Sequence, residues 1–377
     1  MRFPEFTGEW EIVSLKDIAV VNPKSEPLLN KFFYIDLESV EKGELKKIQE
    51  ILQEEAPSRA QRVISNNDIL FQCVRPYQKN NYIHRVKNTS NIQWIASTGY
   101  AQIRTTESPN YIYHLLNTDG FNRKVMVRCT GSSYPAINSE DLSAIRFYLS
   151  TDKKEQCKIA RLLDLLDERI STQNKIIEDL KKLKSAIIDK LYSSTNGETY
   201  SFRQLFEVVN EKNKARAYKN VLSASQELGM IERSDINIDI KFEQESISGY
   251  KIVRKGDYVV HLRSFQGGFA FSDRTGICSP AYIILRPNDL VVYSYLSHYF
   301  TSKPFIKSLK LVTYGIRDGR SINVDEWLDM PILLPPAQEQ IRILTIVNAI
   351  DAKLHNEVKV QFCLSSQKSY LLNTMFI

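Results

Sequence analysis

The chain has 377 residues, of which 43% are hydrophobic and 25% charged, a composition typical of a folded protein with room for two or three domains. The net charge is +6, a mild excess that fits an anionic partner such as nucleic acid without requiring one. The first residues lack the apolar core of a signal peptide, and no window is apolar enough to span a membrane. The sequence therefore predicts a cytoplasmic protein with no membrane segment.

Residues 1–151 are expected to form a first domain of mixed α/β (α+β) class. Its segments Ile69–Val74 and Tyr100–Ile103 are rich in β-branched and aromatic residues, which favours strands. The stretch Asn110–Leu116 between strand candidates is expected to be a short helix.

Two polar loops in this first domain are candidates for contact with nucleic acid. Their Arg, Gln, Asn and Lys side chains are of the kinds that read base edges or hold phosphates, and a nearby aromatic ring can stack or pack. The alternative interpretation of the first of these loops, which begins at Arg75, is a solvated turn. The candidate residues are Arg75, Gln78, Lys79, Asn80, Ser132, Ser133 and Tyr134.

Residues 152–195 are predicted to form a first long helix. Asp152 followed by Glu155 is typical of a capping box. Apolar residues then follow in alternating steps of four and three, the spacing of a coiled-coil seam. Most of the seam consists of Ile159, Leu163, Leu166, Ile170, Leu180, Ile187 and Leu191.

The same pair of domain and helix is predicted again over residues 196–335 and 336–377. Glu155-Gln156 aligns with Glu339-Gln340, an offset of 184 residues that continues without a gap to the chain end. Upstream, Asp68 matches Asp257, and Ile137-Asn138 matches Ile322-Asn323, with small shifts expected from loop insertions. The second seam is expected to consist of Ile343, Val347, Ile350, Leu354, Leu364, Leu371 and Met375.

The loops of the second domain are candidates for the same role as those of the first. In the second pair of loops, residues 128–135 and 313–321, the flanks agree between the two halves and the loop tips differ. Two readers of different targets on a shared scaffold would show this pattern, and drift of loop sequences without a functional reason is the alternative. The candidates are Arg263, Ser264, Gln266, Arg317, Arg320 and Ser321.

Neither long helix can bury its apolar stripe against one small domain, so we expect the two helices to pack together as an antiparallel coiled coil. Polar residues interrupt both seams at matching places, Gln173 with Glu357 and Lys184 with Lys368. Such residues fix register or mark where another protein packs, and we favour register.

Motifs for catalysis or metal binding are missing from the sequence. The five cysteines stand singly, and no histidine has zinc-finger or triad spacing. The sequence has no Gly-x-x-x-x-Gly-Lys phosphate-binding loop. It also has no Asp-Pro-Pro-Tyr or Asn-Pro-Pro-Tyr motif, which an amino-methyltransferase would show. His114 and His298 match in the repeat, and packing on a short helix is favoured over catalysis. We expect a binding protein with no catalytic residues, metal or cofactor of its own.

The order of domain, helix, domain and helix resembles the DNA specificity subunits of type I restriction-modification systems. The resemblance covers nearly the whole chain, and its most specific sign is Leu333-Leu334-Pro335-Pro336 leading into Glu339-Gln340-Ile341. The similar Phe147-Tyr148-Leu149 leads into Glu155-Gln156, although the first copy lacks the prolines.

This resemblance implies a non-catalytic subunit whose two target-recognition domains each read one half of a split, asymmetric site in double-stranded DNA. It implies a coiled coil that serves as spacer and dock for two modification subunits, which methylate adenine with S-adenosylmethionine. It further implies ATP-dependent translocating restriction subunits in the full complex. Two alternatives stay open: a stand-alone DNA methyltransferase or nuclease with unrecognised motifs, and a coiled-coil scaffold.

Overall fold

The computed structural model describes residues 1–85, 92–225, 228–233, 244–261, 268–314 and 321–376. The chain divides into two compact units, Met1–Asn174 with Lys359–Ile377, and Lys175–Val358. Each unit contains one globular part and a segment of each of two long helices, α5 (Lys153–Ser193) and α10 (Ala337–Met375). We call them the first unit and the second unit. No described helix is long and apolar enough to cross a membrane.

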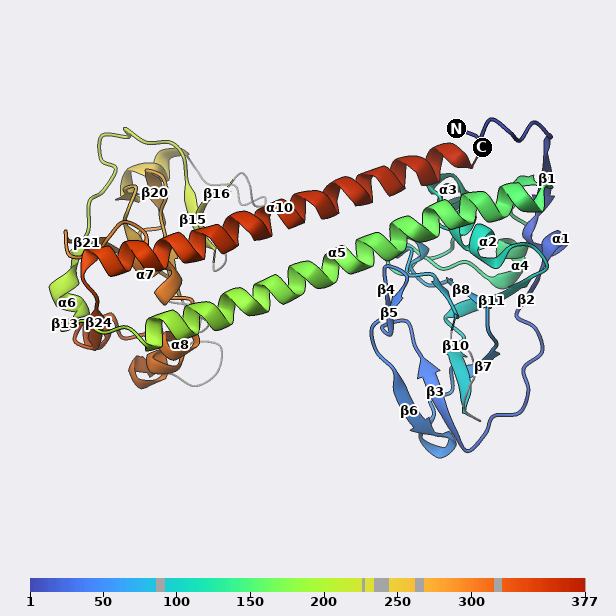
Figure 1. Cartoon of the computed structure of the whole chain (residues 1–377), viewed down its shortest axis with the longest axis horizontal. Helices are drawn as coiled ribbons and strands as arrows, with labels where there is room; N and C mark the ends of the chain where they lie inside the picture. The colour runs from blue at the N-terminus through green and yellow to red at the C-terminus, as the bar shows by residue number, and fades with distance from the viewer. Residues whose placement is uncertain (86–91, 226–227, 234–243, 262–267, 315–320, 377) are drawn as a thin grey trace. The chain divides into compact units, whose positions relative to one another are not determined.

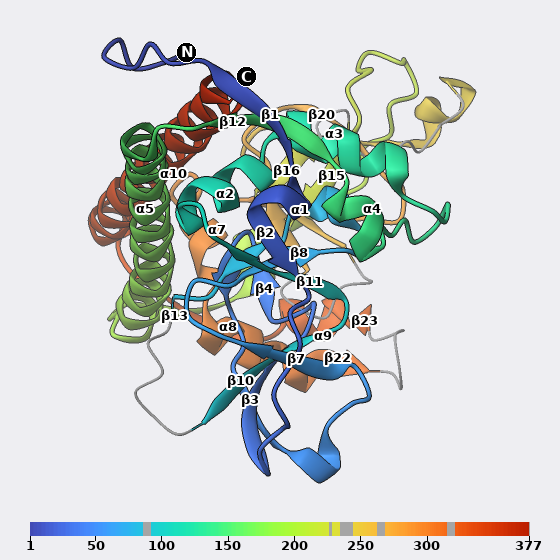
Figure 2. The ribbon, with the colours of Figure 1, turned by 90° about the vertical axis from the view of Figure 1, so that its right-hand side faces the viewer.

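In the first unit, the beginning of α5 packs against the end of α10. Ile159 and Leu163 of α5 share one buried core with Leu372 and Met375 of α10 and with the globular part. Because the start of one helix meets the end of the other, the two helices are antiparallel, as predicted. Figure 2 shows helix α2 (Pro109–Leu116) beside α5 in this unit.

The second unit shows the reciprocal arrangement. Ile188, near the end of α5, shares a core with Ile343 and Val347, near the start of α10. The pairing of the long helices is therefore antiparallel here as well.

The sheet nearest the helices in the first unit has the order β2-β11-β8-β9, with every neighbouring pair antiparallel. Its strands are β2 (Ala19–Val21), β11 (Tyr100–Thr105), β8 (Ile69–Gln72) and β9 (Tyr82–Ile83). A second sheet, of order β6-β3-β10-β7, contains one parallel pair, β3 with β10. Its strands are β6 (Gln49–Leu52), β3 (Lys31–Ile35), β10 (Gln93–Ser97) and β7 (Ala60–Ile64).

The first unit is completed by short elements. Strand β1 runs antiparallel to β12, the strand that leads into α5. These elements are β1 (Trp10–Ser14), β12 (Arg146–Ser150), β4 (Val40–Glu41), β5 (Glu44–Leu45), α1 (Leu15–Ile18), α3 (Asp119–Arg128), α4 (Ser139–Ser143), η1 (Gln53–Glu55) and η2 (Pro76–Gln78).

The second unit repeats this plan. Its central sheet has the order β14-β21-β18-β19, again antiparallel throughout, and β13 pairs with β24 as β1 pairs with β12. These strands are β13 (Glu198–Ser201), β14 (Phe206–Val209), β18 (Tyr258–Val260), β19 (Phe269–Phe271), β21 (Ile283–Pro287) and β24 (Pro331–Leu334). The helices are α6 (Phe202–Leu205), α7 (Tyr295–Tyr299), α8 (Lys303–Ser308), α9 (Val324–Leu328), η4 (Gln244–Gly249) and η5 (Leu309–Val312).

The two units differ most where the first has its second sheet. Among the described residues, the second unit has only two-stranded pairs in the corresponding part of the chain. These pairs are β15 (Leu222–Ser225) with β16 (Gly229–Glu232), and β17 (Lys251–Val253) with β20 (Gly276–Cys278). Later in the chain, β22 (Thr313–Tyr314) pairs with β23 (Ser321–Ile322).

The end of each long helix is fastened to its unit by a matching contact. In the first unit, the Asn373 side chain accepts a hydrogen bond from the Asp119 amide at 2.9 Å. In the second, the Asp189 carboxylate accepts one from the Lys303 amide at 2.9 Å. Asn373 and Asp189 occupy equivalent positions in the repeat, as do Asp119 and Lys303. The same hydrogen bond from a backbone amide to a side chain of the long helix therefore occurs in both units.

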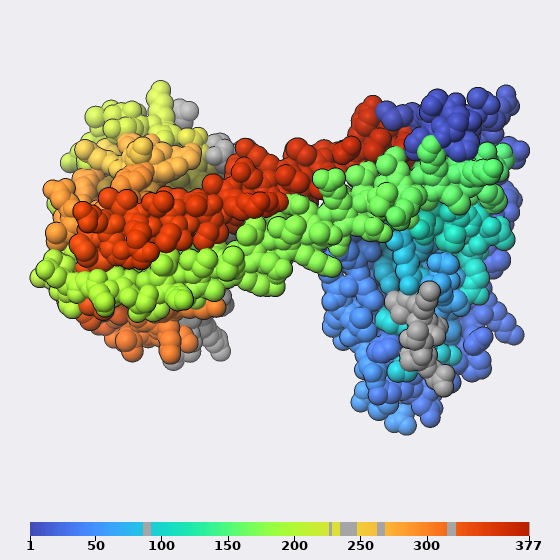
Figure 3. Space-filling model, viewed as in Figure 1, coloured from blue at the N-terminus to red at the C-terminus, as the bar shows by residue number. Residues whose placement is uncertain are grey.

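The two chain ends meet in the first unit, where Figure 3 shows the N-terminal residues against the end of α10. The Met1 amine donates to the Thr374 carbonyl. Arg2 and the Trp10 indole both donate to the buried Glu155 carboxylate. Asp152 caps α5 by accepting from the Lys154 amide at 2.7 Å, but Glu155 does not complete the predicted capping box, because Arg2, Trp10 and Ser150 occupy its oxygens.

Candidate nucleic-acid interface

The first candidate loop begins where β8 ends. Arg75 has a positive φ of 54° and precedes the single turn η2. The Gln78 and Lys79 amides donate to the carbonyls of Arg75 and Pro76, both at 3.0 Å. These bonds give the loop a defined turn, and Tyr77 stands out of it with 49% of its surface exposed. Tyr77 is not among the residues predicted from the sequence, although an aromatic residue in a polar loop indicates a role in stacking or packing.

The structure brings the two candidate loops of the first unit together. The Arg75 amide donates to the Pro135 carbonyl at 2.8 Å, and Val74 forms a β-bridge with Ala136. The Arg75 guanidinium lies over the Tyr134 ring, 4.3 Å from its centre, which is cation–π geometry. Segments some sixty residues apart in the sequence therefore form one surface.

The tip of the second loop contributes exposed side chains to this surface. Tyr134 is 63% exposed, and Ser132 and Ser133 are exposed beside it. Gly131 has a φ of +88°, and a Cβ there would lie 3.0 Å from the Tyr134 carbonyl oxygen. The tight turn at the tip therefore favours glycine.

Gln78, Lys79 and Asn80 lie in the same loop but make contacts within the unit. The Gln78 amide oxygen accepts from the Gln72 side chain at 2.9 Å. The Asn80 amide oxygen accepts from the Lys42 backbone at 3.0 Å.

The Lys79 ammonium donates to the Asp119 carboxylate at 2.5 Å and to the Asn117 carbonyl at 3.2 Å. This ion pair lowers the pKa of Asp119. Arg75 and the tip at 132–134 are thus better placed for an external ligand than Lys79.

Most of the second unit's candidates lie outside the described residues: Arg263, Ser264, Gln266, Arg317 and Arg320. Ser321 is described in its backbone alone, as the first residue of β23, opposite Tyr314. The flanks of the first of these loops are set by a hydrogen bond of 2.9 Å from the His261 amide to the Gly268 carbonyl.

Both units support these loops with the same buried ion pair. In the first, the Arg104 guanidinium donates to both oxygens of Asp68, at 2.8 and 2.7 Å. In the second, Arg286 does so to Asp257, at 2.9 and 3.0 Å. Each carboxylate is nearly inaccessible and ties the start of β8 or β18 to the central strand β11 or β21. The matched Asp and Arg residues of the repeat are therefore scaffold.

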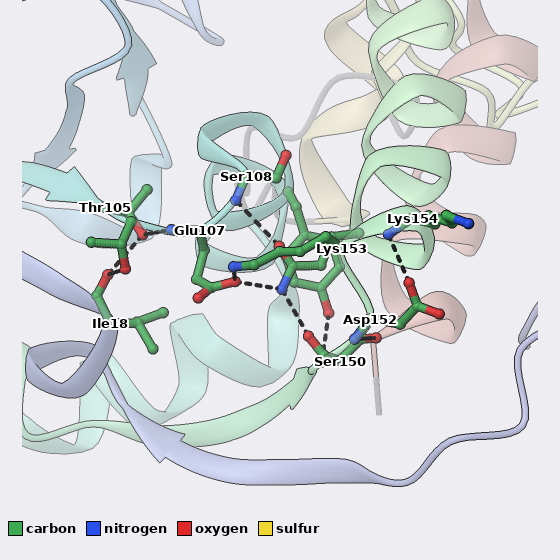
Figure 4. A network of polar contacts seen from close by, with 11 residues as sticks. Ile18, Thr105, Glu107, Ser108, Ser150, Asp152, Lys153 and Lys154 are labelled. Carbon is green, nitrogen blue, oxygen red and sulfur yellow. Dashed lines mark hydrogen bonds and ion pairs between the residues drawn. The ribbon is translucent and has the colours of Figure 1, made fainter.

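A buried glutamine joins each long helix to its globular part. Gln156 donates to the Ser150 carbonyl and the Glu107 carboxylate, both at 2.7 Å, and accepts from the Ser108 amide at 3.2 Å. Figure 4 shows this network of Glu107, Ser108 and Ser150 around the start of α5.

Gln340 does the same for α10. It donates to the carbonyls of Leu290 and Pro335, both at 2.9 Å, and accepts from the Val292 amide at 2.8 Å. The shared Glu-Gln of the repeat thus sets how each helix leaves its unit.

The predicted seam residues of α5 and α10 are all buried or half-buried. Ile159, Leu163, Ile343, Val347, Leu364 and Met375 are buried, and Leu166, Ile170, Leu180, Ile187, Leu191, Ile350, Leu354 and Leu371 are half-buried.

The pattern missed Ile188 and Leu372, which match in the repeat and are 4% and 8% exposed. Both belong to cores that also contain residues of the globular part. They are buried because each helix end faces two neighbours, its partner helix and its globular part.

His114 is buried on the short helix α2, as expected. Its Nε2 lies 2.9 Å from an oxygen of Asp164, which also accepts from Arg85 and Asn110. His114, Arg85 and their hydrogen bonds hold the pKa of Asp164 at about 2 despite its burial. Among the described residues, no group of three or more His, Cys, Asp or Glu could hold a metal ion.

Comparison with protein families gives a match over most of the chain. The family model described as "Type I restriction modification DNA specificity domain" matches residues 7–182 and 197–361. No curated protein matches the sequence.

Solved structures resemble the chain, and two of them share its fold. One, from a study of complex assembly and conformational transition of the type I R-M system, has 20% identity and a TM-score of 0.63 over 98% of this chain and 97% of that chain. The type I restriction-modification S subunit of M. genitalium has 14% identity and a TM-score of 0.57 over 100% and 99%. The HsdS subunit of Thermoanaerobacter tengcongensis has 20% identity and a TM-score of 0.46 over 99% and 97%.

Proposed function

The chain belongs to the family of type I restriction modification DNA specificity domains, and we propose that it reads a split, asymmetric DNA site, one half with each unit. Recognition of DNA target sites is the function of this non-catalytic family, which decides against the stand-alone enzyme and the scaffold. The observation that carries the split site is the repeat itself: one scaffold occurs twice, while the residues at the loop tips differ.

In the first unit, the joined surface of Arg75 and Tyr134 is the proposed base-reading element. Arg and Gln side chains carry the base readout, and Lys and Ser side chains favour phosphates. The residues proposed for the first half-site are Arg75, Gln78, Lys79, Asn80, Ser132, Ser133 and Tyr134. Those proposed for the second are Arg263, Ser264, Gln266, Arg317, Arg320 and Ser321.

The proposed target-recognition domains are residues 1–151 and 196–335. Residues 152–195 and 336–377 are the proposed spacer helices, on which partners dock. The buried Gln156 and Gln340 support this division, because each fixes a helix to its own globular part at the point where the two meet.

We propose that the partners are two modification subunits, which transfer methyl groups from S-adenosylmethionine to adenine, and ATP-dependent restriction subunits in the full complex. Both cofactors belong to those partners. The assembly is expected in the cytoplasm, where it meets chromosomal DNA.

The test is methyl transfer by purified components. The chain alone, given S-adenosylmethionine and DNA, should transfer no methyl groups, and adding the modification subunit should start transfer to adenine at defined sites. Turnover by the chain alone would contradict the proposal. So would sequence-independent methylation by the assembled complex.

A further inference from the structure

Two connections leave the central sheet of the second unit from the same end of its strands. Strands β14 and β18 both run antiparallel to β21, so they are parallel to each other. Val209, at the end of β14, lies opposite Ile284, and Val260, at the end of β18, lies opposite Ile283. The segment after β14 therefore emerges from the same end of the sheet as the end of β18. The proposed readers Arg263, Ser264 and Gln266 follow β18 in the sequence.

The segment after β14 contains a strongly basic loop, residues 212–219. Its four cations are Lys212, Lys214, Arg216 and Lys219, and it has no acidic residue. All four side chains are exposed, and none forms an ion pair with another described residue. Figure 1 shows the connection from β14 to β15 as a yellow-green arch beside β15 and β20.

Buried contacts hold the loop in shape. The Asn213 side chain, 1% exposed, donates to the Tyr218 carbonyl at 2.8 Å and accepts from the Tyr218 amide at 3.3 Å. The Tyr218 ring packs against a core cluster that includes Ile252. Arg216 adopts a positive φ of 52°, a conformation that costs free energy in a non-glycine residue. The cations are thus presented by a fixed frame rather than by a free tail.

The first unit has no equivalent basic loop in the described segment after its strand β2. The segment after strand β2 of the first unit leaves its sheet from the corresponding end of the strands. Between Asn22 and Lys31 it contains one cation, Lys24, and one anion, Glu26. The two charges cancel, so the basic loop distinguishes the second unit.

We propose that the basic loop binds the phosphodiester backbone of duplex DNA beside the second half-site, independently of sequence. A fixed frame that displays several cations suits phosphates, because they repeat regularly along the duplex and each bound phosphate releases counterions. The inference rests on the proposed function and adds an asymmetry to it: the second unit supplies more of the non-specific affinity than the first.

The experiment measures DNA binding by the assembled complex of this chain with its modification subunits. The dissociation constant for a labelled duplex that lacks the methylation motif is measured over a series of salt concentrations. The test variant combines Lys214→Gln and Arg216→Gln. The control combines Arg203→Gln and Lys255→Gln. Both residues are exposed cations, and they precede β14 and β18, so they lie near the opposite end of these strands. Both variants lose two positive charges.

We expect the test variant to reduce the slope of log Kd against log salt by about 1 to 2, because each lost phosphate contact removes about 0.9 from the slope. The control should retain the slope of the unaltered chain, and the methylated motif should stay the same in both variants. An unchanged slope in the test variant, with motif-specific binding intact, overturns the basic-loop inference and leaves the proposed function standing. A change of motif in the second half-site also overturns it, since the loop would then read bases. If the unaltered complex shows no preference for any motif, the proposed function fails and the inference fails with it.

Discussion

Lys184 of α5 and Asp351 of α10 form an ion pair across the two helices of the second unit, with Nζ and Oδ1 2.5 Å apart. Lys368 and Asp167, their equivalents in the repeat, form the same pair in the first unit. Lysines that interrupt the apolar seams are thus matched by carboxylates on the opposite helix. An ion pair of this kind stabilises one alignment of the two helices relative to shifted alignments. It therefore supports the hypothesis that the polar seam residues fix the register of the helices.

Exchanging the charges of this pair should test that role. Asp351→Lys alone sets two cations together and should destabilise the second unit by a few tenths to about 1 kcal/mol, the range for partly exposed pairs. Adding Lys184→Asp should restore most of the loss. The measurement is urea unfolding of the full chain. A double variant no more stable than the single one would show that the contact contributes nothing to register.

Gln340 should be more important to stability than its neighbours in the same turn. Gln340→Ala leaves the Val292 amide and two carbonyls without their partner, at a cost of about 1 to 3 kcal/mol. Gln338→Ala, at an exposed position of the same turn, should cost little. Hydrogen exchange would report the loss as faster exchange at residues 290–292 and at the start of α10. Equal protection in both variants would argue against the anchoring role.

The buried His84 should make the first unit sensitive to acid. It is inaccessible to solvent, and burial lowers its pKa from the usual 6.5 to about 4. Above pH 6.5 the imidazole is neutral in both the folded and unfolded states. As the pH falls toward 4, only the unfolded state binds the proton, so stability declines, by about 1 to 3 kcal/mol.

His84→Phe is the matched variant, because a phenyl ring can keep the contact with Trp94, whose ring centre lies 5.1 Å away. The stability difference between the unaltered chain and this variant should shift in favour of the variant as the pH falls from 6.5 to 4. A difference that stays constant across this window would contradict the assignment.

Arg75 and Lys79 should differ in their effect on DNA recognition although only four positions separate them. Arg75→Ala should relax preference in the first half-site alone, by about 1 to 3 kcal/mol at the affected base pair. Lys79→Ala should change preference little, because its ammonium is held by Asp119. Methylation of competing duplexes, each altered in one half-site, gives the comparison. A larger effect at Lys79 than at Arg75 would reverse the two roles.

Much of the architecture could be predicted from the sequence because the repeat and the seam spacing are local signals. The strands β8 and β11 lie where the β-branched and aromatic runs predict them, within one or two residues. The sheet β6-β3-β10-β7 was not predicted, since its parallel pair joins segments about sixty residues apart and no local pattern specifies a distant strand partner.

The candidate site was less predictable, because composition identifies a polar loop but not its contacts. The composition of its loop predicts Lys79 as a phosphate ligand, but it does not predict the contact of its ammonium with Asp119, 40 residues later. Matching the two halves of the repeat does not reveal the basic loop at 212–219, because the segment after β2 in the first half contains only one cation and one anion.

The central claim is that each unit reads its own half of one asymmetric site, and the methylated-adenine motif tests it most directly. The motif is mapped in DNA from cells that carry this chain with its modification partner, and again with Arg75→Ala. We expect two unlike half-sites separated by an unspecified gap, with only one half relaxed in the variant. A single continuous motif, or a variant that relaxes both halves equally, would contradict the account.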